Sequence, residues 1–196
     1  YRTMEIQRYK VKVSDEIMET LRIRLVHSRC PAKVSASERE YGTDVGYLKE
    51  LVEYWQTFFN WRTQENYINS FNQYRASISG LGIHFIHEKG IGPNPFPLII
   101  SHGWPGSIFE MLKIIPMLTD PAASGGNPED AFDVVVPSLP GYGFSDRPQS
   151  RGYSNIRIAE MWHKLMTEGL GYSRFGSQGG DWGGAICSWL GFDNPR

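Results

Sequence analysis

The chain has 196 residues, of which 40% are hydrophobic and 21% charged, a composition that supports a folded core and excludes a disordered protein. A net charge of −1 excludes a general nucleic-acid binder, which carries an excess of basic residues. The cysteines, Cys30 and Cys187, are too few for a disulfide framework, and no CxxC spacing suggests a zinc or redox site.

The sequence also bears on where the protein works. No apolar run approaches the roughly 18 residues of a membrane span, and no signal peptide is recognisable. Because two cysteines favour a reducing compartment, we expect a cytoplasmic protein. Membrane association is expected only through a segment upstream of Tyr1, since the chain does not open on methionine.

Residues 1–92 are predicted to form a mainly helical first lobe. Its expected elements are a strand at 9–13, a helix between Ser14 and Pro31, helices over 44–60 and 63–71, and strands over 74–78 and 83–88 about a turn at Ser79-Gly80. The 44–60 helix carries a broad aromatic and apolar stripe. Such a stripe favours packing in a core over a cofactor site.

Residues 93–196 are predicted to form a second lobe, after a segment at 90–97 dense in glycine and proline. Its expected elements are strands over 98–101, 133–137 and 175–178, helices over 108–118, 155–170 and 182–190, and a surface loop at 119–130. Alternation of strands and helices predicts an α/β fold with a parallel sheet and right-handed crossovers.

The strongest chemical signal is Asp181, which lies in a glycine-rich turn between a predicted strand and a predicted helix. The pattern fits a nucleophile elbow with aspartate in place of serine, and bulk at Gly179 or Gly183 would collide with neighbouring backbone. An aspartate is already ionised at neutral pH, so it suits attack on an sp3 carbon with a good leaving group. A plain connecting loop and a phosphate cradle are the alternatives, although the carboxylate would repel phosphate.

A second signal is the loop His102-Gly103-Trp104-Pro105-Gly106, directly after a predicted strand. In an α/β-hydrolase sheet this loop supplies one backbone N–H of an oxyanion hole, and the residue after the nucleophile supplies the other. The expected donors are therefore Trp104 and Trp182. For His102 we favour a structural role, tying the loop down by hydrogen bonds, over an acid–base role.

The other histidines and cysteines give weaker signals. His84 and His87 are three residues apart on a predicted strand and point to opposite faces, so they cannot share a metal ion with Glu88. His163 is predicted to be half-buried on a helix and is given no role. Cys187 is expected to be a small core residue, because no base is placed to activate it.

Several motifs of this sequence resemble those of the microsomal-type epoxide hydrolases. The motifs that carry the resemblance are His-Gly-Trp-Pro-Gly-Ser at 102–107, Pro-Ser-Leu-Pro-Gly-Tyr-Gly-Phe-Ser at 137–145 and Gln-Gly-Gly-Asp-Trp-Gly at 178–183. In the first lobe it extends to Tyr54-Trp55, Phe59-Asn60-Trp61-Arg62 and the stretch 78–87. It implies an α/β-hydrolase core with an N-terminal extension, and a role in detoxification or in breakdown of aromatic hydrocarbons.

The resemblance also implies a two-step mechanism without cofactor or metal. Asp181 would attack a small apolar epoxide to form an alkyl ester, and water activated by an acid–histidine pair would hydrolyse that ester, with Trp104 and Trp182 stabilising the oxyanion. Two lid tyrosines would donate to the epoxide oxygen. All five histidines precede Asp181, so the acid, the base and the lid have no counterpart here.

Residues 1–196 therefore look like the N-terminal half of an enzyme, inactive alone, which needs a C-terminal half or another copy to complete its sheet. A haloalkane dehalogenase is one alternative, since the Asp-Trp pair suits halide binding, although the N-terminal lobe speaks against it. A truncated, non-catalytic interaction module is the other.

Overall fold

A computed structural model describes residues 4–32, 40 and 42–193, and the chain divides into two compact units. The first unit comprises Tyr1–Val11 and Tyr67–Arg196, and the second comprises Lys12–Asn66. Residues 67–88, expected in the first lobe, thus share a unit with the later strands. The lobe boundary at 92/93 remains a prediction about the sequence.

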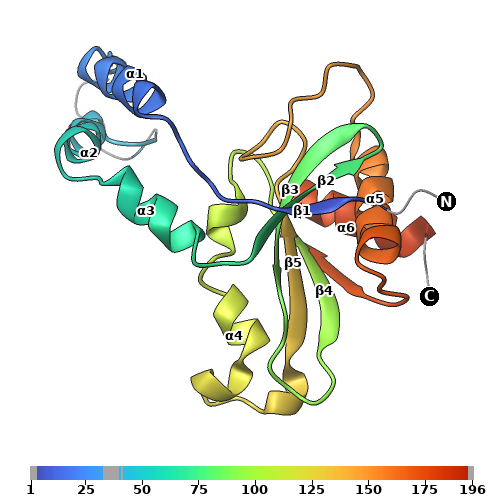
Figure 1. Cartoon of the computed structure of the whole chain (residues 1–196). Helices are drawn as coiled ribbons and strands as arrows, with labels where there is room; N and C mark the ends of the chain where they lie inside the picture. The colour runs from blue at the N-terminus through green and yellow to red at the C-terminus, as the bar shows by residue number, and fades with distance from the viewer. Residues whose placement is uncertain (1–3, 33–39, 41, 194–196) are drawn as a thin grey trace. The chain divides into compact units, whose positions relative to one another are not determined.

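The first unit is built on a six-stranded sheet with the strand order β1-β2-β3-β5-β4-β6 (Figure 1). The strands are β1 (Ile6–Arg8), β2 (Gln73–Ile78), β3 (Leu81–Glu88), β4 (Phe96–Ser101), β5 (Phe132–Pro137) and β6 (Gly176–Gly179). The predicted parallel part is confirmed, because β5, β4 and β6 run parallel. The strands β1, β2 and β3 add an antiparallel part, in which β3 pairs with β5.

The tight hairpin between β2 and β3 forms at the predicted turn. Ser79 and Gly80 have φ angles of 52° and 82°, so both occupy the left-handed region that a two-residue hairpin turn requires. At the other side of the sheet, β4 and β6 are in register with Ser101 opposite Gly179. This register brings the ends of the two strands that precede the candidate site side by side.

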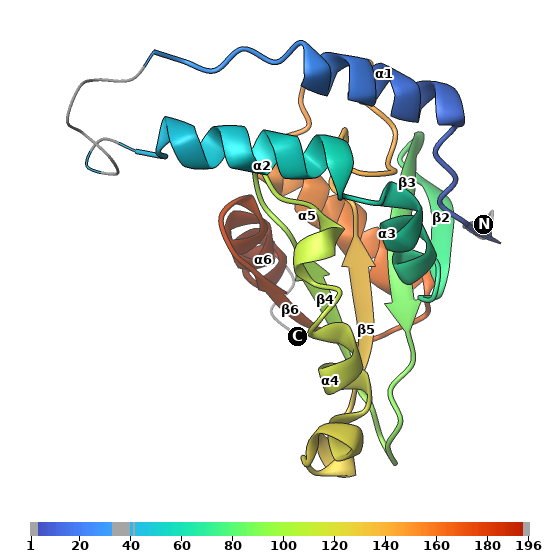
Figure 2. The same cartoon turned by 90° about the vertical axis from the view of Figure 1, so that its left-hand side faces the viewer.

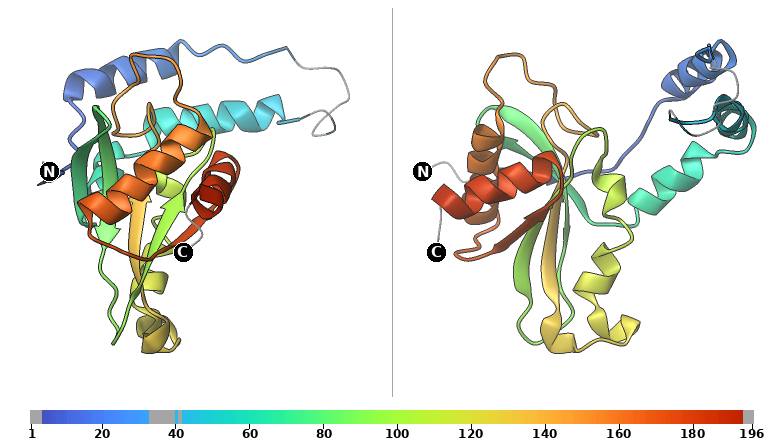
Figure 3. Two further views of the ribbon diagram at one scale, coloured as in Figure 1. Left: turned by 90° about the vertical axis from the view of Figure 1, so that its right-hand side faces the viewer. Right: turned by 180° about the vertical axis from the view of Figure 1, so that it is seen from behind.

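Two helices cover one face of the sheet, and a short helix lies on the other face (Figures 1 and 3). The paired helices are α5 (Asn155–Lys164) and α6 (Trp182–Asp193), and the short one is α4 (Ile115–Thr119). Trp162 of α5 is completely buried, and its indole N–H donates to the Ser101 hydroxyl at 2.9 Å. The core beneath α5 and α6 therefore anchors the end of β4.

Three predicted helical or loop segments differ from the structure. The helix expected at 108–118 is split into a 3-10 turn, Ile108–Glu110, and α4, since Pro116 lacks the N–H and the space to continue an earlier helix. The helix expected at 155–170 changes after Lys164 into a π-helical turn, Leu165–Gly169. The predicted loop at 119–130 contains two 3-10 turns, Pro121–Ser124 and Pro128–Asp130.

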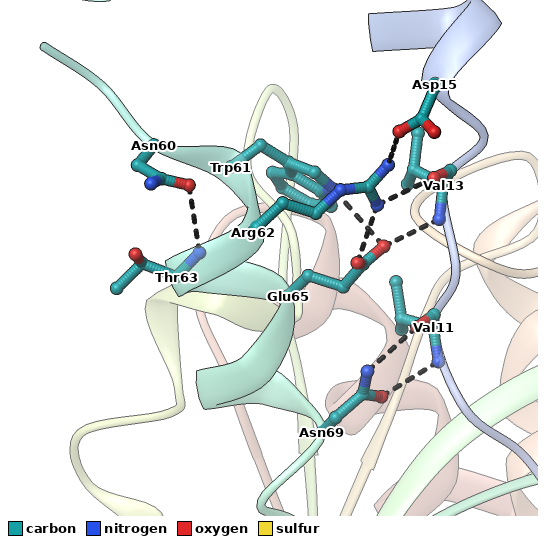
Figure 4. Close-up of polar contacts among 9 residues, drawn as sticks. All are labelled: Val11, Val13, Asp15, Asn60, Trp61, Arg62, Thr63, Glu65 and Asn69. Atoms are coloured by element: carbon teal, nitrogen blue, oxygen red, sulfur yellow. Dashed lines mark hydrogen bonds and ion pairs between the residues drawn. The ribbon is translucent and has the colours of Figure 1, made fainter.

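The strand predicted at 9–13 is wrong, because β1 ends at Arg8 and the chain after it has a different partner. The Asn69 side chain accepts a hydrogen bond from the Val11 N–H at 2.9 Å and donates one to the Val11 carbonyl at 2.8 Å (Figure 4). An amide side chain thus replaces a neighbouring strand, so the apolar alternation at 9–13 does not require sheet pairing.

The second unit contains α1 (Asp15–Val26), α2 (Val45–Thr57) and the start of α3 (Trp61–Ile68). The helices α1 and α2 lie side by side, and Gln56 donates to the Leu25 carbonyl at 2.9 Å (Figure 2). The predicted core packing of the α2 stripe is wrong within the described residues, since no residue of α2 is buried and Phe58 just after it is 77% exposed. Two helices and part of a third are too few to enclose so broad a stripe.

A polar cluster on α3 holds the extended segment before α1 (Figure 4). Glu65 accepts from the Val13 N–H at 2.6 Å, and Arg62 donates to the Val13 carbonyl at 2.7 Å. Arg62 also pairs with Glu65 and with Asp15 in the first turn of α1.

Within residues 4–32, 40 and 42–193, no helix is long and apolar enough to cross a bilayer.

Candidate active site

Asp181 lies at the sharp turn between β6 and α6, where the sequence predicts a nucleophile. Its φ angle is 52°, in the left-handed region that few residues other than glycine adopt. A Cβ on Gly179 would lie 2.5 Å from the Gly183 carbonyl carbon, and one on Gly183 would lie 2.1 Å from the Ser101 oxygen. The prediction that bulk at these two positions would collide is confirmed. The turn leaves the Asp181 residue exposed.

Two backbone N–H groups hold the Asp181 carboxylate. The Trp104 N–H donates to Oδ1 at 2.8 Å, and the Trp182 N–H also bonds the carboxylate. These N–H groups, that of Trp104 first, lower the pKa of Asp181 from its usual value near 3.8, so the group is ionised throughout the neutral range. The structure thus brings together the three groups that the sequence places in the site.

The loop after β4 approaches Asp181 closely because Gly103 has no side chain. A Cβ on Gly103 would lie 2.5 Å from Asp181 Oδ1, so only glycine leaves room for the carboxylate. The next peptide bond, Trp104–Pro105, is cis. An ionised, exposed carboxylate held by two N–H groups can attack an electrophilic carbon, and the same donors can stabilise an oxyanion on its carbonyl.

His102 is buried behind this loop and is fully engaged by backbone groups. The Leu139 N–H donates to its Nε2 at 3.1 Å, and its Nδ1 lies 3.1 Å from the Gly103 carbonyl oxygen. Burial lowers the pKa of His102, which favours the neutral ring. These contacts support the interpretation that His102 holds the loop and does not exchange protons with Asp181.

The segment 138–146 also belongs to the site, and reasoning from the sequence used it only as a family motif. The Tyr142 ring packs edge-on against His102, with ring centroids 5.5 Å apart, and against Trp182, with centroids 6.3 Å apart. The side chains of Trp104 and Trp182 are exposed beside Asp181. The only sequence signal for these contacts is the Gly141-Tyr142-Gly143 spacing, in which both glycines have positive φ angles.

His84 and His87 point to opposite faces, as predicted, and each has its own partners. His84 is buried between Ser138 Oγ and Gln73 Oε1, each 2.9 Å from a ring nitrogen, and burial lowers its pKa to about 3. His87 contacts the Tyr172 hydroxyl at 2.9 Å, and burial lowers its pKa to about 4. In the part of the chain that the structure describes, no cluster of His, Cys, Asp or Glu could hold a metal ion.

Two other residues from the sequence analysis lie on α5 and α6. His163 is half-buried against the ring of Phe175, as predicted. Burial raises the pKa of the Cys187 thiol, so this cysteine is a poor nucleophile at neutral pH.

Comparison with protein families gives two matches that together span the chain. Residues 6–111 match the family described as "Epoxide hydrolase N terminus", and residues 97–195 match the "alpha/beta hydrolase fold". Among curated proteins, "Epoxide hydrolase 1" of Oryctolagus cuniculus is 42% identical over 187 residues, which cover 93% of this chain and 41% of that protein.

Two solved structures are similar over almost the whole chain. The juvenile hormone epoxide hydrolase of the silkworm Bombyx mori has a TM-score of 0.86 at 28% identity, and the match covers 98% of this chain and 51% of the silkworm chain. The Aspergillus niger epoxide hydrolase has a TM-score of 0.85 at 30% identity, and the match covers 98% of this chain and 50% of the fungal chain. The chain thus spans about half the length of these relatives or less.

Proposed function

Because this chain belongs to the epoxide hydrolase family, with the α/β-hydrolase fold, we propose that it carries the nucleophile and the oxyanion hole of an epoxide hydrolase. The observation that carries the proposal is the Asp181 carboxylate, exposed at a strained elbow and held by the N–H groups of Trp104 and Trp182. The substrate is a small apolar epoxide, which the exposed indoles of Trp104 and Trp182 suit.

In the first step an Asp181 oxygen attacks a ring carbon of the epoxide. A carbon–oxygen bond of the ring breaks as the ester bond forms, and the released alkoxide takes a proton from an acidic donor. The family resemblance assigns this donor to two lid tyrosines. The lowered pKa of Asp181 supports the step, because the nucleophile needs no general base at neutral pH.

In the second step water attacks the aspartyl carbonyl carbon, and a base accepts its proton. The carbonyl oxygen becomes an oxyanion that the N–H groups of Trp104 and Trp182 stabilise. Collapse of the tetrahedral intermediate breaks the bond between the carbonyl carbon and the ester oxygen. The departing alkoxide takes the proton that the base accepted, and the diol leaves with one oxygen from the Asp181 carboxylate.

The base and its acidic partner, we propose, lie outside residues 1–196. None of the five histidines, all within the described part of the chain, hydrogen-bonds with Asp181; they are His27, His84, His87, His102 and His163. A further segment would also pair with β6, which in the described residues has a neighbouring strand only on the β4 side. Residues 1–196 alone are therefore proposed to be inactive.

A single turnover of the full-length enzyme in ¹⁸O-water tests the mechanism. Hydrolysis through an ester places the label in Asp181, whereas direct attack of water on the epoxide places it in the diol. Asp181→Ala should abolish diol formation, because a methyl group offers no nucleophile. Label in the diol from the first turnover, or an active Asp181→Ala variant, would overturn the assignment.

The same preparation separates the two alternatives. A haloalkane dehalogenase would release halide from a 1-haloalkane and leave an epoxide unchanged. An interaction module would form no ester on Asp181 with either substrate, which mass spectrometry of the intact protein would show.

A further inference from the structure

One peptide group of the site is hydrogen-bonded at both ends. The carbonyl oxygen of Gly103 lies 3.1 Å from His102 Nδ1, and the N–H of the same peptide group, that of Trp104, donates to Asp181 Oδ1 at 2.8 Å. His102 and the candidate nucleophile are therefore connected through a single amide. The ring of His102 is itself almost completely buried, with 1% exposure.

The hydrogen-bond partners fix the tautomer of His102. The Leu139 N–H can only donate, so the Nε2 atom that it contacts carries the lone pair. A neutral imidazole then has its proton on Nδ1, and this proton is donated to the Gly103 carbonyl. A doubly protonated ring would lose the acceptor for Leu139, in agreement with the lowered pKa of His102.

A hydrogen bond to a peptide carbonyl polarises the N–H at the other end of the same amide, and the effect is stronger away from water. We propose that His102 is a positioning residue for ester hydrolysis, which orients and polarises the Gly103–Trp104 peptide so that the Trp104 N–H binds the oxyanion on the Asp181 carbonyl. The inference rests on the proposed function, because it assumes an ester on Asp181.

The proposal distinguishes the two steps of the reaction. Before the reaction, the Trp104 N–H stabilises the carboxylate, and a weaker bond leaves that nucleophile slightly more reactive. During hydrolysis the negative charge develops on the carbonyl oxygen, where a weaker donor raises the barrier. Loss of the His102 contact should therefore slow hydrolysis without slowing ester formation.

Two substitutions of His102 separate its two contacts. In His102→Asn, the side-chain amide can still donate from near the Nδ1 position to Gly103 but does not reach Leu139. In His102→Gln, the amide oxygen can still accept from Leu139 near the Nε2 position, but no donor faces Gly103. Both variants lose the ring, so their difference compares loss of the contact with the Gly103 carbonyl against loss of the contact with the Leu139 N–H.

The experiment measures ester formation and ester decay separately in the full-length enzyme, by rapid quench and intact-protein mass spectrometry with styrene oxide. We expect His102→Gln to slow ester decay roughly tenfold, part of the roughly 10²–10³ that loss of a whole oxyanion donor costs, and to accumulate the ester. His102→Asn should keep decay within about threefold of the wild type. His163→Gln, a half-buried histidine away from the site, should change neither rate.

The outcomes are distinct. Equal slowing of both steps in His102→Gln, or equal decay rates in the Gln and Asn variants, would overturn the role of His102. Absence of any ester on Asp181 in the wild-type enzyme would overturn the proposed function instead.

A measurement on the wild-type protein serves if the variants do not fold. His84 is predicted to be the opposite tautomer, because Gln73 donates its amide to Ile68 and Asn69, and its oxygen therefore accepts from His84 Nε2. The ¹⁵N shifts of the histidine rings at pH 7 should show Nδ1–H for His102 and Nε2–H for His84. A charged His102, or one protonated at Nε2 alone, would overturn the proposal.

Discussion

The substitution Gly183→Ala tests how the elbow is packed. A Cβ at this position would lie 2.1 Å from the Ser101 oxygen, 2.8 Å from the Ser101 carbonyl carbon and 3.0 Å from the His102 oxygen. All three are backbone atoms, so no side chain can rotate out of the way. An ordinary carbon–oxygen contact is about 3.3 Å, so α6 or the end of β4 must move by about 1 Å.

The free-energy cost follows from two opposing effects. Overpacking of this kind costs up to about 3 kcal/mol. Alanine in a helix gains at most about 1 kcal/mol over glycine. We therefore expect Gly183→Ala to lower the free energy of unfolding by about 2 kcal/mol, measured by urea denaturation of the full-length protein. The same movement separates the Trp104 N–H from Asp181, so hydrolysis of the ester should also slow.

The matched control is Gly191→Ala in the same helix, where a Cβ would meet nothing within 4 Å. This variant should be as stable as the wild type or slightly more stable, by up to about 1 kcal/mol. If Gly183→Ala proved as stable as Gly191→Ala, the close packing of α6 on β4 would be refuted.

Three further predictions concern pH and the isolated chain. Because the pKa of Asp181 lies below its usual value, its carboxylate should stay ionised from pH 8 down to about pH 5, and its protonation should not lower the single-turnover rate of ester formation in that range. A fall in this rate with a midpoint above pH 5, assigned to Asp181, would contradict the prediction. Burial lowers the pKa of His84 to about 3 and that of the partly buried His87 to about 4, so the unfolded chain binds more protons than the folded chain below its histidine pKa near 6.5. Stability should therefore fall as the pH drops from 6.5 to 4, by up to about 1.4 kcal/mol per pH unit for each histidine, and His87→Gln should flatten the slope in urea titrations. Purified residues 1–196 should hydrolyse styrene oxide no faster than background and should self-associate through β6; a monodisperse, active preparation in ultracentrifugation and diol assays would count against both statements.

Local signals in the sequence were sufficient for the part of the fold that carries the nucleophile. The run Val134–Val136 is completely buried in β5, as expected of a strand covered on both faces. The glycines around Asp181 predicted a tight turn, because their spacing reports steric limits within a few residues. The same local reasoning failed for residues 9–13, because Val11 bonds the side chain of Asn69 and Val13 bonds those of Glu65 and Arg62 instead of a neighbouring strand.

The supporting contacts of the site could not be predicted because they join residues far apart in the chain. Nothing near His102 indicates that its Nε2 accepts from Leu139, 37 residues later, or that Ser138 is bonded by His84, 54 residues earlier. These pairs exist because β3 and β4 both lie beside β5, an order that the spacing of strands does not specify.

Catalysis and stability depend on the same atoms at this site. Gly183 rests against the backbone of Ser101 and His102, and Gly103 rests against the Asp181 carboxylate, so the helix after the nucleophile and the loop with the oxyanion donor are placed by mutual contact. A side chain at Gly183 would press on the backbone of Ser101 and His102, whereas one at Gly103 would press on the Asp181 carboxylate itself; either would move the Trp104 N–H relative to Asp181. The polar contacts of His102 then act within limits set by this packing: they orient and polarise a donor whose distance to the nucleophile the two glycines determine.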